Sequence, residues 1–301
     1  MATHFKTTDM VGIKEDVADV ITNLSPRKTP FQSSIGSEKV TQPLFQWQED
    51  SLRDVKDDNA AVEGADATFA DITPTVMRNN YTQIFTEAVQ VSDRADVVAT
   101  YGRKREFAYQ MAKSAAQVKR DVEHAYIGKD SVKAAGSSST PSKMDGYFSQ
   151  IDQSMVVYTG AATPFNEATL LSALQKAYDE GAEPTRIQVT PTNSLVLADF
   201  AKAAGRYRTF EGSDKTIVNV VNLYVSPFGE QKVELNRFLK AGDTLVYDPA
   251  QWTKPTLRPW ERKNLAKTGD STKAMLLGEF SLKHKNFKAS ALVREGAAPT
   301  P

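Results

Sequence analysis

The clearest apolar pattern in the chain lies between residues 103 and 128. Apolar side chains recur there at steps of three or four residues, which places them on one face of an amphipathic helix. They are Phe107, Met111, Ala115, Val118, Val122 and Ala125. Gly128 follows this pattern and suits the C′ position of a helix. We therefore predict a helix over Arg103–Ile127, about 37 Å long at 1.5 Å per residue, that acts as a scaffold along the molecule.

Two shorter helices are predicted further along the chain. Asn166 is a good N-cap, and Phe165 and Leu170 are spaced as a hydrophobic staple around it. Gly181 ends the apolar pattern of this helix. A second short helix is expected at about Asn193–Ala204.

Strand patterns surround these helices. Val40–Gln48 alternates between apolar and polar residues, and Pro43 restricts such a strand to a sheet edge or a bulge. Tyr81–Val91 has strand-like composition, so the two strands are predicted to flank the polar segment between them as a long β-hairpin arm. Further strands are predicted at 186–190, 217–225, 232–235, 244–247 and within 274–293. The sum predicts an α+β fold with mixed sheets.

The first 40 residues show little sustained periodicity. Only Val11–Leu24 has apolar residues at helical spacing, so we expect an N-terminal arm that carries one short helix. The arm is too poor in apolar residues to form a core of its own.

Composition narrows the class of protein. The 301 residues are 40% apolar and 25% charged, with 37 basic and 37 acidic side chains and no cysteine. The absence of cysteine excludes disulfides and thiolate metal sites. No apolar run is long enough to suggest a membrane span. No secretory signal is recognised. Zero net charge predicts no general attraction to nucleic acid or to an anionic membrane.

The charges are nevertheless segregated along the chain. Glu49–Asp71, which we call the acidic segment, has eight acids against two bases, whereas Trp252–Arg294 has ten bases against three acids. Each run can be a solvated face, or the oppositely charged segments can meet within or between chains.

No catalytic or cofactor motif is present. The three histidines have no metal-site spacing, and the acidic segment lacks the spacing of a calcium-binding loop. Gly269-Asp270-Ser271 is more typical of a polar turn than of an esterase, and only His284 follows Ser271 closely enough to suggest a hydrolase. We therefore predict a protein that is not an enzyme and that has no cofactor and no metal.

An ordered series of short motifs points to a family instead. The motifs are Ser25-Pro26-Arg27-Lys28-Thr29-Pro30-Phe31, Trp47-Gln48-Glu49-Asp50-Ser51-Leu52, Val225-Ser226-Pro227-Phe228-Gly229, Asn236-Arg237, Leu257-Arg258-Pro259 and Leu265-Ala266-Lys267-Thr268-Gly269-Asp270-Ser271. In this order they resemble tailed-bacteriophage major capsid proteins related to that of phage SU-ten. The resemblance spans about Ser25 to Val293, with no landmark between residues 129 and 163.

The resemblance implies the Hong Kong 97 capsid fold and a division of the chain into five parts. These would be an N-terminal arm (1–40), an extended β-hairpin loop (41–91), a peripheral domain with a spine helix (92–185, helix 103–127), an axial domain (186–245), and peripheral return strands with a C-terminal tail (246–301).

The implied function is that of a head protein that assembles with itself, as pentamers and hexamers, into an icosahedral shell around double-stranded DNA. Implied partners are portal and scaffolding proteins, a decoration protein, and DNA through non-specific contacts, with no membrane. The location would be the virion, after synthesis in the bacterial cytoplasm. The alternatives are another phage subunit such as a tail tube, or the shell protein of a cellular nanocompartment with the same fold.

For a shell protein the candidate site is the surface between subunits. We predict that the acidic segment reaches over a neighbouring subunit and meets the basic segment after Trp252. The candidate ionic contacts are Asp50, Asp54, Asp57 and Asp58 against Arg258, Arg262, Lys263 and Lys267. The candidate apolar anchors are Trp47, Leu52, Trp252 and Trp260, because aromatic residues dominate interface energies.

Overall fold

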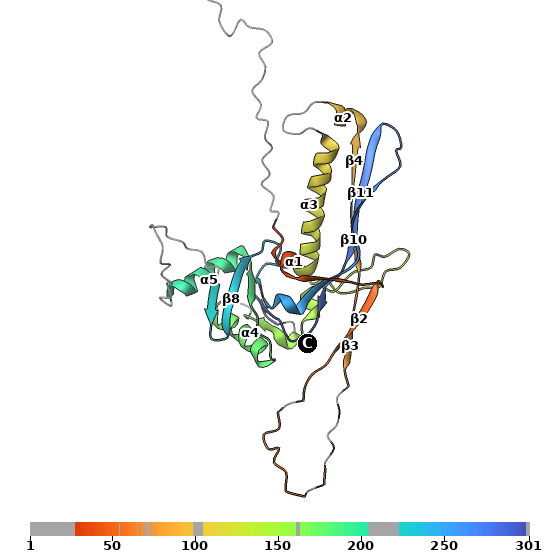
Figure 1. The fold of residues 1–301 in the computed structure, drawn as a ribbon. Coiled ribbons are helices and arrows are strands. Elements are labelled where there is room, and N and C mark those ends of the chain that lie inside the picture. Colours follow the sequence, from red (N-terminus) through yellow and green to blue (C-terminus); the bar gives the residue numbers. More distant parts are fainter. Residues whose placement is uncertain are drawn as a thin grey trace, which may run out of the picture.

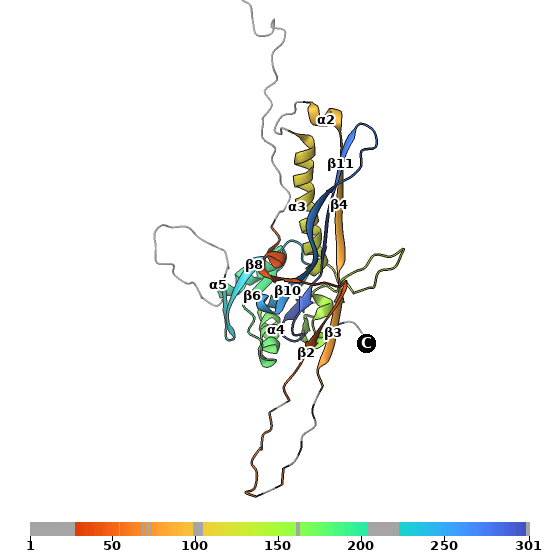
Figure 2. The same ribbon diagram turned by 45° about the vertical axis from the view of Figure 1, so that its right-hand side comes forward.

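The computed structural model describes residues 28–298 apart from 54, 65, 68, 70, 71, 73, 99–104, 161–162 and 204–222. The predicted helix at Val11–Leu24 lies outside these residues. A long helix stands beside a tall sheet, a second sheet lies to one side, and a two-stranded hairpin projects from the base (Figures 1 and 2). The described part is therefore α+β, as predicted.

The long helix α3 (Glu106–Ile127) packs along the tall sheet. Its buried stripe includes Phe107, Met111, Val118 and Val122, as the sequence predicted, whereas Ala115 of the predicted stripe is exposed. The sheet has the strand order β1-β10-β11-β4, and β12 pairs with β10. Their bounds are β1 (Gly36–Lys39), β4 (Gln83–Ser92), β10 (Trp252–Asn264), β11 (Ser271–Phe280) and β12 (Lys283–His284). The thirteen-residue strand β10 lies within the return strands that the resemblance implied at 246–301, although the residue pattern alone did not predict a strand there.

Gly128 ends α3, but not in the expected conformation. Its φ of −87° is right-handed, whereas a C′ glycine is typically left-handed. A lack of room for a side chain explains the glycine instead, because a Cβ at this position would lie 1.9 Å from Nδ1 of His124 and 2.4 Å from the carbonyl oxygen of Phe238.

The second sheet has six strands in the order β5-β13-β9-β6-β8-β7. Their bounds are β5 (Val156–Tyr158), β6 (Arg186–Val189), β7 (Leu223–Ser226), β8 (Gly229–Leu235), β9 (Asp243–Tyr247) and β13 (Ala291–Arg294). The sheet joins strands from the predicted axial range with β5 and β13 from outside it. The described strands at 186–189, 223–226, 229–235 and 243–247 confirm the sequence patterns there, while residues 217–222 lie outside the described part.

Helices α4 (Glu167–Asp179) and α5 (Pro191–Ala203) accompany this sheet. The side chain of Asn166 accepts a hydrogen bond from the backbone N–H of Thr169, whose hydroxyl lies near the N–H of Asn166 in a reciprocal capping box. Gly181 then adopts a left-handed φ of +82°. The start and end predicted for α4 are thus confirmed by its caps. Helix α5 begins two residues earlier than predicted.

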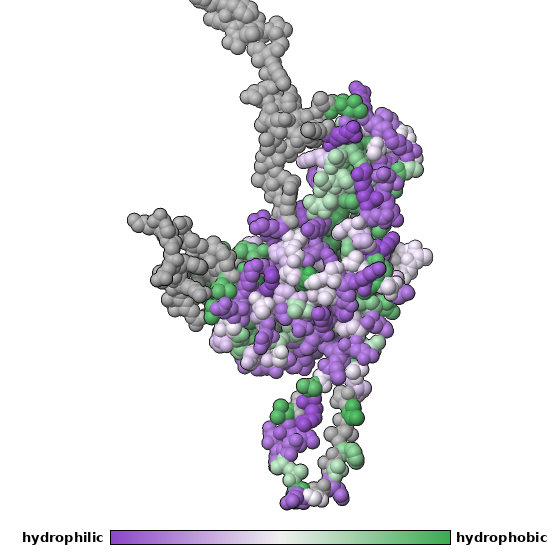
Figure 3. Space-filling model, in the orientation of Figure 1, coloured by the Kyte–Doolittle hydropathy of each residue, from purple (hydrophilic) through white to green (hydrophobic). Residues whose placement is uncertain are grey.

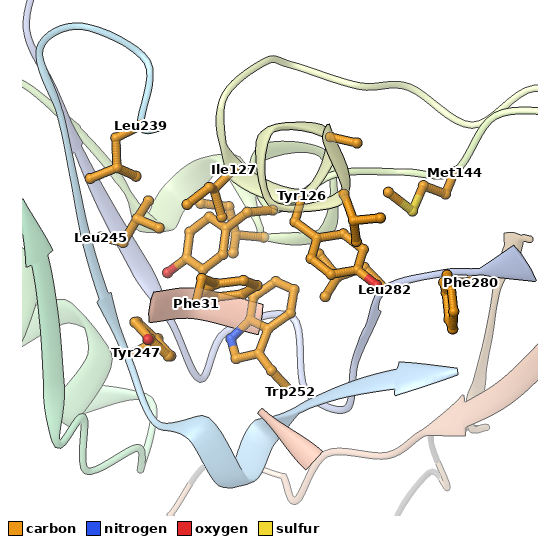
Figure 4. Close-up of a cluster of buried hydrophobic side chains, with 14 of the residues drawn as sticks. Phe31, Tyr126, Ile127, Met144, Leu239, Leu245, Tyr247, Trp252, Phe280 and Leu282 are labelled. Carbon is orange, nitrogen blue, oxygen red and sulfur yellow. The ribbon is translucent and has the colours of Figure 1, made fainter. Parts of the chain in front are cut away.

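The main core lies where α3, the six-stranded sheet and the start of β10 meet. Short helix α1 (Pro30–Ser34) inserts Phe31 into this core, with ring centroids 5.2 Å from Tyr247 and 5.8 Å from Trp252 (Figure 4). Tyr147 stacks on Trp252 at 4.6 Å. Helix α1, which precedes the first strand, is therefore fixed to the body of the subunit.

The projecting hairpin consists of β2 (Leu44–Glu49) and β3 (Val76–Tyr81). The predicted pairing was wrong, since the strand at residues 81–91 does not return the hairpin. That strand is β4, and it pairs along its whole length with β11 in the tall sheet. Strand pairing depends on partners distant in sequence, which the composition of Tyr81–Val91 does not identify. Pro43 precedes β2 and interrupts no strand.

The remaining short elements are α2 (Asp93–Val97) and three 3-10 turns, η2 (Phe148–Gln150), η3 (Gln153–Met155) and η4 (Pro249–Gln251). No helix within the described ranges is long and apolar enough to cross a membrane.

Candidate functional site

The base of the hairpin is tied to the segment that follows β12. The carboxylate of Glu49 accepts hydrogen bonds from Nε of Arg78, across the hairpin, and from the backbone N–H of Phe287, both at 2.8 Å. The guanidinium of Arg78 lies 3.8 Å from the ring centroid of Phe287. These contacts join both hairpin strands to one point on the body, so they fix the direction in which the hairpin projects.

Trp47 belongs to this base. Its ring stacks on Phe45 with centroids 5.6 Å apart, and the ammonium of Lys283 lies 5.8 Å from its centroid. Lys283 also forms a 3.0 Å ion pair with Glu38 on β1. Trp47 is only 9% exposed, so it offers little surface to a neighbour. We correct its predicted role, because the packing that covers Trp47 comes from its own chain.

The described residues of the segment 50–75, which we call the extended loop, stand clear of the body (Figure 3). The loop carries large apolar side chains at almost full exposure. They are Leu52 (98%), Phe69 (97%), Ile72 (93%) and Val55 (91%). The sequence analysis named only Leu52. Large apolar residues in an otherwise polar, small-residue segment are the signal that could have identified the others.

The acidic side chains of the loop share this exposure. Asp50, Asp57 and Asp58 are exposed, and Asp54 lies outside the described residues. Asp58 accepts a hydrogen bond from the backbone N–H of Ala60 at 3.0 Å, and Asp50 accepts one from that of Ser51. These local bonds shape the loop and leave the charges at the surface.

The predicted basic partners lie on β10 and in the turn after it, and most already have partners in their own chain. Arg258 pairs with Glu279 at 2.8 Å, and Lys263 approaches Glu261 at 3.7 Å. Lys267 pairs with Asp93 at 2.8 Å, and this hydrogen bond, with one from Thr272, lowers the pKa of Asp93. The same contact raises the pKa of Lys267. The basic segment is therefore a partly neutralised surface.

Arg262 has different neighbours. Its guanidinium lies 5.2 Å from the ring centroid of Phe107 on α3 and donates a 3.1 Å hydrogen bond to Asn264. None of the ion pairs found in the described part of the chain includes Arg262. Its positive charge is the least compensated of the four predicted bases.

The two remaining tryptophans occupy opposite environments. Trp260 is 41% exposed and packs beside Phe280, with centroids 4.9 Å apart. Trp252 is fully buried, stacks on His284 at 4.0 Å and donates a hydrogen bond to Ser290 at 2.9 Å. The prediction that Trp252 anchors a neighbour is wrong, because the subunit core covers the whole side chain. Trp260 keeps the surface that an anchor needs.

The structure brings no catalytic pair together at Ser271 and His284. Ser271 is the first residue of β11 and His284 lies beyond the other end of this ten-residue strand, whose length is about 30 Å at 3.3 Å per residue. His284 is fully buried, and this burial lowers its pKa to about 3. Within the described ranges, no group of three or more histidine or acidic residues is placed to hold a metal ion.

Comparison with known proteins agrees with an assembly role. The family model described as SU10 major capsid protein matches residues 2–297. The chain belongs to this family. A curated relative, the major capsid protein of Escherichia phage Phieco32, is 30% identical over 97% of the chain and 96% of its own length. The SU10-type protein is thus a phage major capsid protein, a structural component of the virion.

Solved structures show the same fold at low sequence identity. A protein of Microbacterium phage Oxtober96 gives a TM-score of 0.66 at 11% identity, covering 94% of this chain and 96% of that one. The capsid of a native GTA particle gives 0.64 at 13% identity, covering 95% and 96%. The SrpI encapsulin complex from Synechococcus elongatus gives 0.57 at 12% identity, covering 91% of each chain. The major capsid protein therefore has the Hong Kong 97-type fold that the sequence motifs implied.

Proposed function

We propose that this major capsid protein assembles with itself, as pentamers and hexamers, into an icosahedral shell around the double-stranded DNA genome of a tailed phage. Family membership supports the shell role, and the fold supplies a projecting loop with which one subunit reaches another. Within this proposal the chain keeps the division into arm (1–40), extended loop region (41–91), peripheral domain (92–185), axial domain (186–245) and return strands with tail (246–301).

The exposure of the loop's apolar side chains is the observation that carries the proposal. Leu52, Val55, Phe69 and Ile72 are each more than 90% exposed in the single chain. Burying one such side chain is worth about 1.5–3 kcal/mol, so a neighbour that covers the loop gains stability at several points. An isolated globular protein gains nothing from holding these side chains in water on a rigidly based hairpin.

The neighbour's receiving surface is proposed on β10. Trp260 supplies an exposed aromatic surface there, and Arg262 supplies a positive charge without a carboxylate partner in the described part of the chain. Asp57 and Asp58 supply the opposite charge on the loop. Arg258, Lys263 and Lys267 hold their in-chain pairs at partly exposed positions. Such pairs are worth about 0–1 kcal/mol each, so an incoming carboxylate can replace them at small cost.

Negative-stain microscopy of the purified, expressed chain tests the proposal, because closed shells, tubes and single subunits are distinct under the microscope. The Asp57→Lys/Asp58→Lys variant should form fewer shells and lose the wild-type dependence on salt. Its matched control is Asp57→Glu/Asp58→Glu, which keeps both charges and should assemble as the wild type does. Tubes, or wild-type yields and salt dependence in the charge-reversed variant, would contradict the proposal.

The nucleic acid content of particles from infected cells separates a genome shell from a nanocompartment, since the two share a fold. Portal, scaffolding and decoration proteins remain proposed partners, which co-purification with immature and mature particles tests.

A further inference from the structure

A fully buried carboxylate marks the point where the N-terminal segment joins the body. Glu123 lies on α3, faces away from solvent and is 0% exposed. None of the ion pairs found in the described ranges includes it, and Lys119, one turn earlier on the same helix, is a cation that lowers its pKa through space. Its burial raises its pKa. Buried charges are costly, so the contacts of this one show what it does.

Three donors converge on Glu123. Its Oε1 accepts hydrogen bonds from the backbone N–H of Phe31 and from Nδ2 of Asn236, and its Oε2 accepts one from the backbone N–H of Gln32, all at 2.8 Å. Both N–H groups belong to the first turn of α1, where a helix has no internal acceptors for them. One side chain thus holds α1 against α3 and against the loop that follows β8.

The contact is part of a closed ring of buried hydrogen bonds. Nδ2 of Asn236 also donates to Gln188 at 3.0 Å, and Gln188 donates to the hydroxyl of Tyr247 at 2.8 Å. That hydroxyl lies 3.0 Å from the hydroxyl of Ser34, which donates to the carbonyl of Phe31 at 2.8 Å. The ring therefore returns to α1 after passing through β6 and β9 of the six-stranded sheet.

Such a ring fixes orientation more than it adds stability. A five-residue helix is not stable by itself. The aromatic cluster around Phe31 holds this side chain in the core but does not set the direction of the helix axis. Fully satisfied buried polar networks specify one arrangement, because any other leaves a polar group without a partner.

We propose that Glu123 is the positioning residue for the root of the N-terminal segment, so that the chain at Lys28 leaves the body of every subunit at the same point and in the same direction. In a shell this exit decides which neighbour the segment can reach. That consequence rests on the proposed assembly function, whereas the local role at α1 does not.

Hydrogen exchange on the full-length, unassembled chain tests the local role. Glu123→Gln keeps the shape but offers one acceptor oxygen and an NH₂ donor to three converging donors. We expect the amides of Phe31 and Gln32 to exchange at least about tenfold faster, while the amide of Val246 in β9 keeps its wild-type protection. The matched control is Asp121→Asn, which removes an exposed charge from the same helix and should change neither.

Ser34→Ala provides a milder test if Glu123→Gln folds poorly. It removes both bonds of the Ser34 hydroxyl, to Tyr247 and to the carbonyl of Phe31, but leaves the three bonds to Glu123, so it should produce a smaller increase at the same two amides. Unchanged exchange in the Glu123→Gln chain, or an equal increase at Val246, would overturn the positioning role.

The yield and size of assembled shells are measured in a separate experiment. If the wild type forms shells, Glu123→Gln should form fewer or irregular ones, and shells of wild-type yield and size would overturn the inference while leaving the assembly function intact. A wild type that forms no shells overturns the assembly function, and the exchange result then decides the local role by itself.

Discussion

Replacing Phe69 with serine should weaken contacts between subunits without weakening the subunit. Phe69 is 97% exposed near the end of the extended loop, so its own chain gives it almost no packing to lose. Burial of a phenylalanine side chain against a neighbour is worth about 1.5–3 kcal/mol. Loss of that burial lowers the equilibrium constant of each contact by about 10- to 150-fold.

Two measurements separate these effects. Light scattering at graded concentrations gives the lowest concentration at which shells form, and this threshold should rise for Phe69→Ser. Thermal melting of the unassembled subunit should show a free energy of unfolding within about 0.5 kcal/mol of the wild type. Ala67→Ser, an exposed change in the same loop, is the control for an added hydroxyl and should leave the threshold unchanged.

The result that refutes the reasoning is an unchanged assembly threshold. It would mean that Phe69 stays in water in the shell and that the exposed apolar residues of the loop are not its contact surface. A less stable subunit would refute it in another way, because it would show that Phe69 packs within its own chain.

Three further predictions concern the subunit itself. Phe31→Ala should lower the free energy of unfolding by about 3–5 kcal/mol in denaturant melts, because the fully buried ring leaves a cavity among four aromatic side chains; a loss below about 1 kcal/mol would contradict this. Gly128→Ala should cost about 1–3 kcal/mol in the same assay, although alanine is the better helix former, since its Cβ would meet His124 and the backbone at Phe238; a more stable variant would contradict the steric argument. Burial lowers the pKa of His284 from 6.5 to about 3, so the unfolded chain binds a proton there before the folded chain does. Stability should therefore fall between about pH 6.5 and pH 3 by about 1.4 kcal/mol per pH unit from this group, and His284→Asn should remove that part of the slope; equal slopes in the two chains would contradict it.

Helices α3 and α4 were predictable because their signals are local. The stripe on α3 depends on spacing within one element, and the predicted N-cap Asn166 directly precedes the first residue of α4. Even so, the role of Gly128 was misjudged. Its position after the helix predicted a left-handed glycine. The structure shows instead that a side chain at this position would collide with the carbonyl oxygen of Phe238, more than a hundred positions away in the sequence.

The sequence predicted which segments form the candidate site, but not which of their residues are available to a neighbour. Segregated charge predicted an acidic loop and a basic segment after Trp252 as the surfaces of a contact between subunits, which stays a prediction. The charge pattern could not show that Arg258, Lys263 and Lys267 form ion pairs with carboxylates of the same chain. Nor could it separate the buried Trp252 from the exposed Trp260, because exposure depends on what the rest of the chain places over each ring.

The sequence by itself determined helices α3, α4 and α5, the α+β class and, through the order of its short motifs, the capsid family. Each of these depends on residues close together in the chain or on their order along it. Only the tertiary structure decided that β4 pairs with β11 instead of closing the hairpin, that Glu49 and Arg78 fix the hairpin at Phe287, and that Glu123 holds α1. These contacts join residues from 29 to 238 positions apart, and the spacing of side chains along one strand or helix carries no information about such a partner.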